Sequence, residues 1–416
     1  MLRAEIISIG DELASGQRLD TNSQWLSQRL GELGVPVVCH CTVADDLATN
    51  VEVFRQAVER ANIVISTGGL GPTADDLTRE ALAGLTGQDL VLDETALAYI
   101  KSLFARRKRD MPERNVVQAM FPRGSRVIHN PEGTAPGIAV DVPRADGATS
   151  HVFALPGVPA EMKQMWEQTV VGALVALGAG RQIIRHRRVK CFGVGESDLE
   201  QMLPDLIRRG REPSVGITVH DATITLRVTA AAPTAEACLS AMAPTMQTIR
   251  DCLGSLVFGE EDDELEHAVI RLLAERGQTL ATCEWGTAGL IADWFGDVPE
   301  AAGCHIGDLV TSSKETLLRV LGVDAAILAE HPPGTVEATR ATAVACRERF
   351  GSDYALAVGP FPGSDVGGSE PGEFRFALAT PSGVTVKSSP FAGHSSILKP
   401  RAAKQALNLL RLALLH

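Results

Sequence analysis

Hydrophobic residues in the first third of the chain occur with two different spacings. Short apolar runs, typical of strands buried in a parallel sheet, occur at residues 5–9, 35–43, 63–66, 138–140 and 152–155. Between them, apolar residues repeat at helical spacing over residues 21–33 and 49–61. This alternation predicts an α/β fold with a parallel-rich sheet covered by helices on both faces, in a domain spanning residues 1–175.

Two short patterns indicate where these helices should begin. Thr21 with Gln24, and Thr49 with Glu52, have the spacing of a capping box. In that motif the first side chain bonds a free backbone N–H of the helix, and the fourth residue reaches back to the cap. We therefore expect Thr21 and Thr49 to be the N-caps of their helices.

The remainder of the chain predicts two further domains. Strand-like segments at 181–192, 215–219 and 222–230, with helices near 197–207 and at 234–252, predict a small α+β domain over residues 180–257. Strands at 279–283, 354–358 and 374–379 alternate with helices, the last at 397–415, and predict a second α/β domain over residues 259–416. The Gly-, Pro- and Ser-rich stretch 359–372 is expected to be a flexible loop.

Charge and composition narrow the class of protein. The chain has 416 residues, with 39 Lys and Arg against 51 Asp and Glu, and a net charge of −12. So acidic a chain is poorly suited to binding nucleic acid. No apolar run approaches the roughly 18 residues of a membrane-spanning helix, and the start of the chain lacks the features of a signal peptide. We expect a cytoplasmic protein that binds neither nucleic acid nor membrane.

The eight cysteines are too dilute for a disulfide framework. We expect them to be small buried hydrophobic residues in a reducing compartment. Cys39 and Cys41 are expected on opposite faces of the strand at 35–43.

Two charged clusters lie near the predicted domain boundaries, a basic one at the start of the second domain and an acidic one at the start of the third. The basic cluster consists of Arg181, Arg185, Arg187, Arg188 and Lys190. It could contact phosphates, but a solvated strand face is the favoured interpretation. The acidic run at 260–266 is expected to begin a helix, because the helix dipole favours negative charge at the N-terminus.

The segment 67–78 joins the strand at 63–66 to a helix, and it contains three glycines and two aspartates. In open α/β sheets, ligands bind beyond the carboxyl ends of the strands. Gly68, Gly69 and Gly71 permit positive φ and close backbone approach, so that N–H groups can face a phosphate. The alternative is a tight turn in which Asp75 caps the following helix.

The acidic residues near this loop favour a metal site. Asp75 and Asp76 would repel a bare phosphate unless a divalent cation bridged carboxylate and phosphate. A second pair, Asp11 and Glu12, follows the strand at 5–9, and the carboxyl ends of the first and third strands share one edge of a parallel sheet. Two acidic pairs beside a glycine loop predict a metal-assisted phosphate site.

Several motifs resemble those of the competence/damage-inducible protein A (CinA) family. In the first domain they are Gly10-Asp11-Glu12-Leu13, Gly16, Thr21-Asn22, the segment 67–78, Gly133-Thr134-Ala135-Pro136-Gly137, and Leu155-Pro156-Gly157-Val158-Pro159-Ala160-Glu161-Met162. Residues 192–197 resemble the family's small middle domain. The resemblance covers the whole chain in domain order, and it implies a molybdopterin-binding fold for the first domain.

The resemblance also implies a reaction, the hydrolysis of ADP-ribose at its pyrophosphate to give AMP and ribose 5-phosphate. The phosphate-binding positions would be Gly68, Gly69, Gly71, Pro72, Thr73, Asn22, Gly133, Pro156 and Gly157. Asp75, Asp76 and Glu12 would be catalytic, while Asp11, Glu12 and Asp76 would hold a divalent metal, expected to be Mg²⁺. Family members often dimerise, so a homodimer is expected.

A second hypothesis belongs to a different class of protein. Fold alone does not choose the substrate, so the same cleft could hold a nucleotide or a pterin without turning it over, as a sensor or scaffold does. The acidic pairs favour the enzyme, because a protein that only binds anions gains from Arg and Lys instead.

The third domain resembles the family's nicotinamide-mononucleotide deamidase domain but departs from it at the chemical positions. Trp285 stands where the family has the presumed nucleophilic serine, and Leu317 where it has the presumed base lysine. Ser395 replaces the arginine of a Gly-Asp-Arg motif, and a glycine-rich segment is broken around residues 358–363. We expect deamidation to be lost, because an indole and an alkyl chain supply neither nucleophile nor base. The alternative is replacement by Ser312 or Ser313 together with Lys314.

Overall fold

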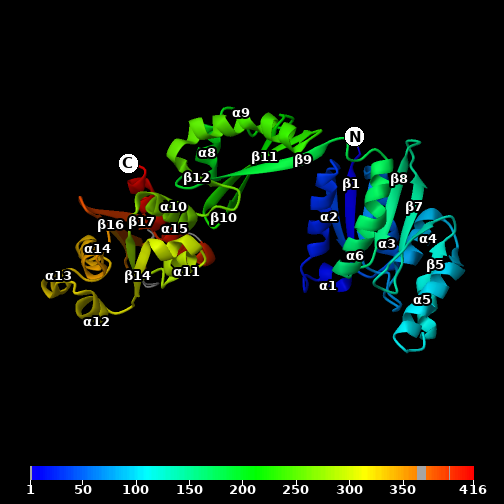
Figure 1. The fold of residues 1–416 in the computed structure, drawn as a ribbon, viewed down its shortest axis with the longest axis horizontal. Helices are drawn as coiled ribbons and strands as arrows, with labels where there is room; N and C mark the ends of the chain where they lie inside the picture. The colour runs from blue at the N-terminus through cyan, green and yellow to red at the C-terminus, as the bar shows by residue number, and fades with distance from the viewer. Residues whose placement is uncertain (1, 363–371, 393) are drawn as a thin grey trace. The chain divides into compact units, whose positions relative to one another are not determined.

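A computed structural model describes residues 2–362, 372–392 and 394–416, and the side chain of Ser395 lies outside the described part. The chain divides into two compact units, a first unit of residues 1–185 and 230–241 and a second unit of residues 186–229 and 242–416. Figure 1 labels their elements, and each unit is described by itself. The domain limits expected from the sequence stay predictions.

The first unit contains a six-stranded sheet with the order β2-β1-β3-β8-β7-β6. Its strands are β1 (Ala4–Ile9), β2 (Val37–Val43), β3 (Ile63–Thr67), β6 (Arg126–Ile128), β7 (Gly137–Pro143) and β8 (Thr149–Leu155). The first four strands in that order are parallel, whereas β7 pairs antiparallel with both β8 and β6. A separate antiparallel pair joins β4 (Leu90–Leu92) to β5 (Met120–Pro122). The predicted parallel-rich α/β fold is confirmed.

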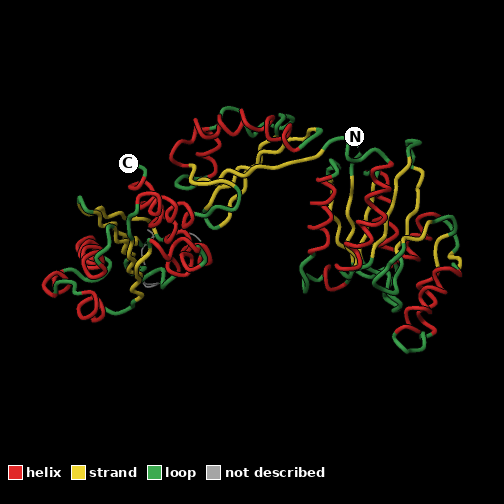
Figure 2. The backbone as a smooth tube through the Cα atoms, in the orientation of Figure 1, coloured by secondary structure: helices red, strands yellow, loops and turns green. Residues whose placement is uncertain are grey.

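Helices cover both faces of this sheet, which Figure 2 shows as yellow strands beside red helices. They are α1 (Asp11–Ala14), α2 (Thr21–Glu32), α3 (Leu47–Arg60), α4 (Thr78–Thr86), α5 (Glu94–Arg106), α6 (Pro159–Met165) and α7 (Val171–Ala176). Adjacent residues of β1 point to opposite faces. Ile6 belongs to a core with Leu26 of α2, and Ile7 to a core with Phe54 of α3. The carboxyl ends of the strands stay open to a ligand.

The helix caps differ from those expected. The N-cap of α2 is Asp20, whose carboxylate accepts from the N–H of Ser23, and the N-cap of α3 is Asp46, which accepts from that of Thr49. Both capping-box predictions were therefore wrong, because an aspartate just upstream supplies a cap at least as good as threonine. The alternative role of Asp75 as a cap is also wrong, since α4 begins at Thr78 with no side-chain cap.

The second unit contains a five-stranded sheet and most of a four-stranded sheet; residues 183–185 and 230–232 of the smaller sheet and residues 235–241 of its helix are counted with the first unit. A four-stranded sheet has the order β10-β11-β9-β12, from β9 (Ile183–Cys191), β10 (Ser214–His220), β11 (Thr223–Ala232) and β12 (Val257–Glu260), with helices α8 (Glu196–Met202) and α9 (Ala235–Leu253). A five-stranded sheet has the order β14-β13-β15-β16-β17, from β13 (Leu280–Glu284), β14 (His305–Val310), β15 (Tyr354–Val358), β16 (Glu373–Thr380) and β17 (Gly383–Pro390). Of the loop predicted at 359–372, residues 363–371 lie outside the described residues.

One core joins these two sheets. Phe192 and Phe258, which flank the smaller sheet, pack in a cluster with Leu273, Leu356 and Leu407. The helices beside the larger sheet are α10 (Leu265–Arg276), α11 (Leu290–Gly296), α12 (Lys314–Thr316), α13 (Ala325–Glu330), α14 (Val336–Phe350) and α15 (Ser395–Leu414). No helix in the described ranges is long and apolar enough to cross a membrane.

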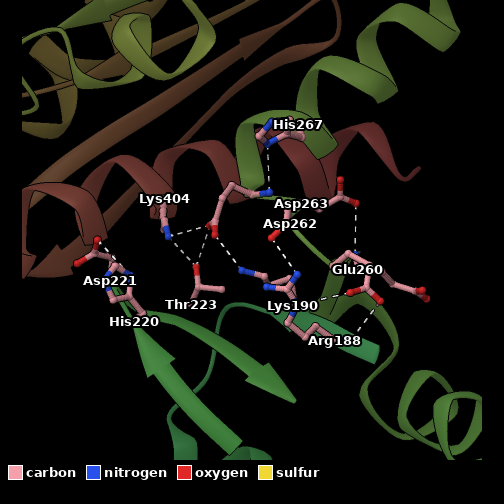
Figure 3. Close-up of polar contacts among 12 residues, drawn as sticks. Arg188, Lys190, His220, Asp221, Thr223, Glu260, Asp262, Asp263, His267 and Lys404 are labelled. Carbon is pink, nitrogen blue, oxygen red and sulfur yellow. Dashed lines mark hydrogen bonds and ion pairs between the residues drawn. The ribbon is translucent and has the colours of Figure 1, made fainter. Parts of the chain in front are cut away.

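The two charged clusters pair with each other. Arg187 pairs with Glu260 and Glu261, Arg188 with Glu261 and Asp262, and Lys190 with Glu264 (Figure 3). Arg187, Arg188 and Lys190 are therefore paired with carboxylates, and Arg187 and Arg188 remain partly exposed to solvent. Helix α10 begins only at Leu265, with Glu264 as its N-cap, so most of the acidic run precedes the helix.

All eight cysteines have free thiols. Five of them are buried, whereas Cys39, Cys41 and Cys252 are partly exposed. The expectation that Cys39 and Cys41 face opposite ways was wrong, because residues two apart on a strand share a face, here the half-buried face of β2.

Candidate functional site

A cavity of about 550 Å³ lies at the carboxyl ends of β1, β3 and β8 in the first unit. Most of the phosphate and acidic positions expected from the sequence line it together: Glu12, Asn22, Gly68, Gly69, Gly71, Pro72, Asp75, Asp76, Pro156 and Gly157. Three expected positions, Asp11, Thr73 and Gly133, are not part of the lining. The sheet thus gathers segments up to about 150 residues apart at one edge, as open α/β folds do.

The glycine loop approaches β1 more closely than any side chain would permit. Gly68 has φ +107°, and a Cβ there would lie 2.1 Å from the carbonyl oxygen of Ile9. Gly69 has φ +64°, and a Cβ there would meet the hydroxyl of Thr78 at 2.3 Å. Both positions require glycine for steric reasons, which ties the loop to the end of β1 on one side and to α4 on the other.

All four carbonyl oxygens of residues 68–71 are held by the first two residues of α4. The Thr78 hydroxyl donates to Gly68 O at 2.9 Å, and the Thr78 N–H donates to Gly69 O at 3.1 Å. Arg79 Nη1 donates to Leu70 O at 2.9 Å, and Arg79 Nη2 donates to Gly71 O. Within the described residues the N–H groups of Gly69 and Leu70 donate to no acceptor. These two N–H groups are therefore unbonded donors of the loop.

Asp76 closes the loop on itself. Its carboxylate accepts from the N–H of Gly71 at 2.8 Å, from the N–H of Thr73 at 2.9 Å, and from the Thr73 hydroxyl. Two of the backbone donors expected to hold phosphate are therefore already bonded to a carboxylate. The structure shows Asp76 bracing the loop, a role that the sequence did not indicate.

A third carboxylate joins the two acidic pairs. Asp11 and Asp45 exchange hydrogen bonds, from Asp11 N–H to Asp45 Oδ2 at 3.0 Å and from Asp45 N–H to Asp11 Oδ1 at 3.1 Å. Burial raises the pKa of Asp45, and the negative charges of Asp11, Asp75 and Glu12 raise it further against the effect of the backbone bond. Hydrogen bonding instead lowers the pKa of the exposed Asp75 carboxyl. Negative charge is therefore concentrated at this edge of the sheet.

Asn22 and Gly133 take part in hydrogen bonds that link the segments around the cavity. Asn22 Nδ2 donates to Thr67 Oγ1 at 3.1 Å and to Gly157 O at 2.9 Å, so it links the end of β3 to the segment after β8. Gly133 donates its N–H to Asn130 Oδ1, and Asn130 Nδ2 donates to Glu161 Oε2 at 2.7 Å. Gly133 therefore lies behind a cavity-lining carboxylate, and a Cβ there would reach within 2.3 Å of it.

Further polar lining residues were missed by the sequence reasoning: Arg18, Asp20, Asp45, Gln118, Thr134 and Glu161. A signal existed for Asp45, since it follows the strand at 35–43 just as Asp11 follows the first strand. Thr134 and Glu161 lay within motifs already singled out. No pattern in the sequence indicates Gln118, which comes from a short turn between α5 and β5.

Only a small cavity lies beside Trp285 and Leu317, at the expected deamidase positions. Trp285 and Leu317 line a cavity of about 10 Å³ together with Cys283, Thr311 and Ala338. That volume is at the lower limit for one water molecule. Leu317 is only 3% exposed. Ser395 lies at the start of α15. Its side chain, and the whole of Gly393, lie outside the described part of the chain.

The residues that could replace the lost groups already have structural roles. Ser313 is the N-cap of α12, with its hydroxyl accepting from the N–H of Glu315 at 3.2 Å. Lys314 Nζ donates to Leu328 O at 2.6 Å. Ser312 is exposed and lies outside the residues lining the small cavity.

The fold and the cleft define the first unit as a molybdopterin-binding-type α/β domain, and residues 5–176 match the family described as a probable molybdopterin binding domain. Residues 186–259 match the damage-inducible protein CinA KH domain, and residues 262–414 match the CinA C-terminal domain.

Full-length relatives support the same assignment. A putative competence-damage inducible protein of Symbiobacterium thermophilum is 39% identical over 425 aligned positions that cover 99% of each chain. A CinA-like protein of Dictyoglomus thermophilum is 34% identical over 417 positions covering 100% of each. A solved structure, the protein CinA with unknown function from Thermoplasma acidophilum, is 37% identical over 41% of this chain and 98% of that one, with a TM-score of 0.38. The chain belongs to the CinA family.

Proposed function

We propose that the first unit is a metal-dependent pyrophosphatase that hydrolyses ADP-ribose or a related nucleotide. The observation that carries the proposal is the edge where the free N–H groups of the glycine loop adjoin Glu12, Asp45 and Asp75. Backbone donors suit a pyrophosphate, and the concentrated negative charge suits the cation that accompanies it. The backbone donors alone would suit an anion, and the carboxylates alone would suit a cation. Together they favour chemistry on a metal-bound phosphate.

The donor set fits Mg²⁺. No group of three or more His, Cys, Asp or Glu side chains in the described ranges is arranged to hold a metal ion. Mg²⁺ does not need such a group, because it keeps several waters and binds through one or two carboxylates together with substrate phosphates. Glu12 and Asp75 would hold it, since Asp11 and Asp76 already accept backbone hydrogen bonds. A bound divalent ion would neutralise phosphate charge and lower the pKa of a water ligand.

The residues of the chain then have separate tasks. The N–H groups of Gly69 and Leu70 would donate to pyrophosphate oxygens and stabilise the charge that develops as the bridging P–O bond breaks. Water adds to one phosphorus atom, its protons pass to the solvent and the departing phosphate, and the products are AMP and ribose 5-phosphate. Little covalent chemistry is asked of the protein beyond such positioning.

The test is turnover of ADP-ribose by the full chain with Mg²⁺, comparing wild type with Glu12→Gln. We expect hydrolysis that stops with chelator and falls at least about 10-fold in the variant. Glu167→Gln, an exposed carboxylate of the same unit outside the cleft, should match wild type. Absence of turnover with Mg²⁺, Mn²⁺ and Co²⁺ would reject the proposal.

A second candidate is binding without turnover. The match of residues 5–176 to a molybdopterin binding domain favours it, because a pterin phosphate would also suit the glycine loop. Tight binding of a pterin or of ADP-ribose, with no products formed over hours, would support this alternative.

We also propose that the second unit has no deamidase activity, because Trp285 and Leu317 fill the position of the reacting groups. The homodimer expected from the family resemblance stays a prediction, which light scattering of the full chain tests directly.

A further inference from the structure

We propose that Arg79 is a positioning residue of the cleft: it holds the end of the glycine loop in place and puts a fixed positive charge behind the loop that binds the anion. The proposal rests on the proposed binding of a pyrophosphate by this loop. Arg79 Nη1 donates to Leu70 O at 2.9 Å, and Nη2 donates to Gly71 O. A planar guanidinium presents its N–H donors in a rigid fork, which suits it to hold two successive carbonyl oxygens at once.

The orientation of the peptide units follows from these bonds. Thr78 and Arg79 together hold the carbonyl oxygens of residues 68–71, so every carbonyl of the loop is directed to the start of α4. Each peptide unit is planar with its N–H opposite its C=O, so fixing the carbonyls also fixes the direction of the N–H groups. The N–H groups of Gly69 and Leu70 share peptide units with the carbonyls of Gly68 and Gly69, so Thr78 fixes their direction. Arg79 fixes the two following peptide units, beginning with the Gly71 N–H that Asp76 accepts, and so holds the end of the loop in place. Donors held in this way gain affinity for an anion because they need not reorganise on binding.

The charge of Arg79 is otherwise uncompensated by direct contact. The side chain is 1% exposed, and no carboxylate in the described part of the chain accepts a hydrogen bond from it. Its Nε is buried without a partner. Burial lowers the pKa of Arg79, while the charges of Glu80 and Asp76 act in the opposite direction. Arginine nevertheless stays protonated in proteins, so a buried cation lies behind the loop.

A buried cation without an ion pair is costly to maintain, and an anion bound to the loop would reduce that cost. The cavity lining contains six carboxylates, Glu12, Asp20, Asp45, Asp75, Asp76 and Glu161, and a single basic residue, the exposed Arg18. Without Arg79 the electrostatics of the cleft would oppose a pyrophosphate. The guanidinium therefore contributes attraction from beneath the loop, where water does not screen it.

The test compares Arg79→Lys and Arg79→Met with wild type, using inorganic pyrophosphate as the probe in titration calorimetry with Mg²⁺ present. Lysine keeps the charge but cannot hold both carbonyls, whereas methionine keeps the bulk and loses both functions. We expect affinity to fall by about 10-fold in Arg79→Lys and further in Arg79→Met, as for the loss of charge-assisted hydrogen bonds. Arg106→Met, an exposed arginine of α5, is the matched control and should bind as wild type.

Two further readouts separate positioning from simple stabilisation. In Arg79→Ala, millimolar guanidinium should restore part of the pyrophosphate affinity, which it would not do in the control. In wild type, titration with pyrophosphate should shift the amide resonances of Gly69 and Leu70 and the Nε–H resonance of Arg79. This measurement applies even if every Arg79 variant fails to fold.

The outcomes distinguish this proposal from the proposed function. Variants that fold and bind pyrophosphate as wild type overturn the role of Arg79, as does an Arg79 resonance that does not respond to pyrophosphate. If wild type binds pyrophosphate in an Arg79-dependent way but never hydrolyses ADP-ribose, the role of Arg79 stands and the enzymatic function falls.

Discussion

At the residue level, the carboxylates of the cleft differ in what opposes their charge. Asp76 accepts three hydrogen bonds from the loop, and hydrogen bonding also lowers the pKa of the exposed Asp75 carboxyl. Asp45 is partly buried among Asp11, Glu12 and Asp75, so burial and these like charges raise its pKa. Such an arrangement lowers stability in the absence of a cation, and it is tolerated where function requires the charge.

We predict that Asp45→Asn raises the melting temperature of the first unit at pH 7 without divalent ions. The amide oxygen can still accept from the N–H of Asp11, while the unfavourable charge is removed. Because the folded-state pKa of Asp45 is raised above 3.8, ionised Asp45 destabilises the fold above that raised pKa, and the penalty disappears as the pH falls below 3.8.

Calorimetry at pH 7 and at lower pH measures this difference. The melting temperatures of the variant and the wild type should converge as the pH falls. Mg²⁺ should also reduce the difference between them, because it offsets the charge of Asp45 in the wild type. A variant that melts below wild type at pH 7 without metal would contradict the assignment of Asp45.

We predict that Asp76→Asn loosens the glycine loop. Asparagine keeps one acceptor oxygen but places an NH₂ group against an N–H donor, so one of the bonds to Gly71 or Thr73 is lost. Amide exchange at these two residues should accelerate by about 10-fold or more, and ADP-ribose hydrolysis should slow by a similar factor. Unchanged exchange, with full turnover at saturating Mg²⁺, would show that the loop does not depend on this carboxylate.

At the level of elements, the apolar pattern predicted the strands that are buried on both faces. Strands β1 and β3 are mostly apolar, and all their residues are buried. The pattern missed β14 and β17, whose residues are alternately exposed at the edges of a sheet and include His305, Asp308 and Lys387. Strands of this kind alternate buried and exposed residues, so they lack the long apolar run that marks a strand buried on both faces.

The same reasoning found the glycine loop but not the bonds that shape it. A run of glycines and aspartates indicates an anion or metal site, yet the sequence cannot show that Asp76 bonds the loop or that Arg79 lies beneath it. Both depend on where α4 begins, and the cap predicted there was wrong. Likewise the basic cluster of β9 pairs with an acidic run about 70 residues further along the chain. The pairing of β9 with β12 brings the two clusters together, so local spacing could not predict the contact.

We predict that Glu264→Gln destabilises the second unit by about 3 kcal/mol, the lower end for breaking a buried pair, since Glu264 is about one-third exposed. Its carboxylate accepts from Lys190 at 3.0 Å and from Lys404 at 3.1 Å (Figure 3). The substitution leaves the ammonium of Lys404, whose side chain is 7% exposed, without its counter-ion. Urea unfolding and amide exchange along α15 measure the loss.

The pH dependence gives an independent check. Burial would raise the pKa of Glu264, but Lys404 and Lys190 outweigh it and lower the pKa. The stabilisation by ionised Glu264 should be fully present above the pKa that this carboxyl has in the unfolded chain. It should be lost as the pH falls through the lower pKa of the folded state. Glu315→Gln, which removes an exposed helical pair with Arg319, should change stability by less than about 1 kcal/mol. Equal effects of the two substitutions would contradict the buried pair.

At the level of the whole molecule, we predict a protein with one chemically competent unit. The purified chain should release no ammonia from nicotinamide mononucleotide, because Trp285 and Leu317 provide neither nucleophile nor base. The cavity beside them, about 10 Å³, has no room for a nicotinamide ring. Trp285→Ser alone should remain inactive, since Leu317 still has no titratable group.

A coupled ammonia assay against a heat-denatured control measures this. Release above the control, removed by Ser312→Ala or Ser313→Ala, would show that the hydroxyls near α12 have taken over the reaction.

Helix α15 also determines how the second unit reaches its fold. Lys404 bonds Thr223 across 181 residues, and Arg411 bonds Val257 across 154. Contacts of such long sequence separation form late and slow folding, because the chain entropy must be lost before they contribute. Until α15 docks, the surface that receives Leu407, Leu410 and Leu414 is exposed to solvent. A newly made or partly unfolded second unit should therefore be a substrate for chaperones and an early site of aggregation.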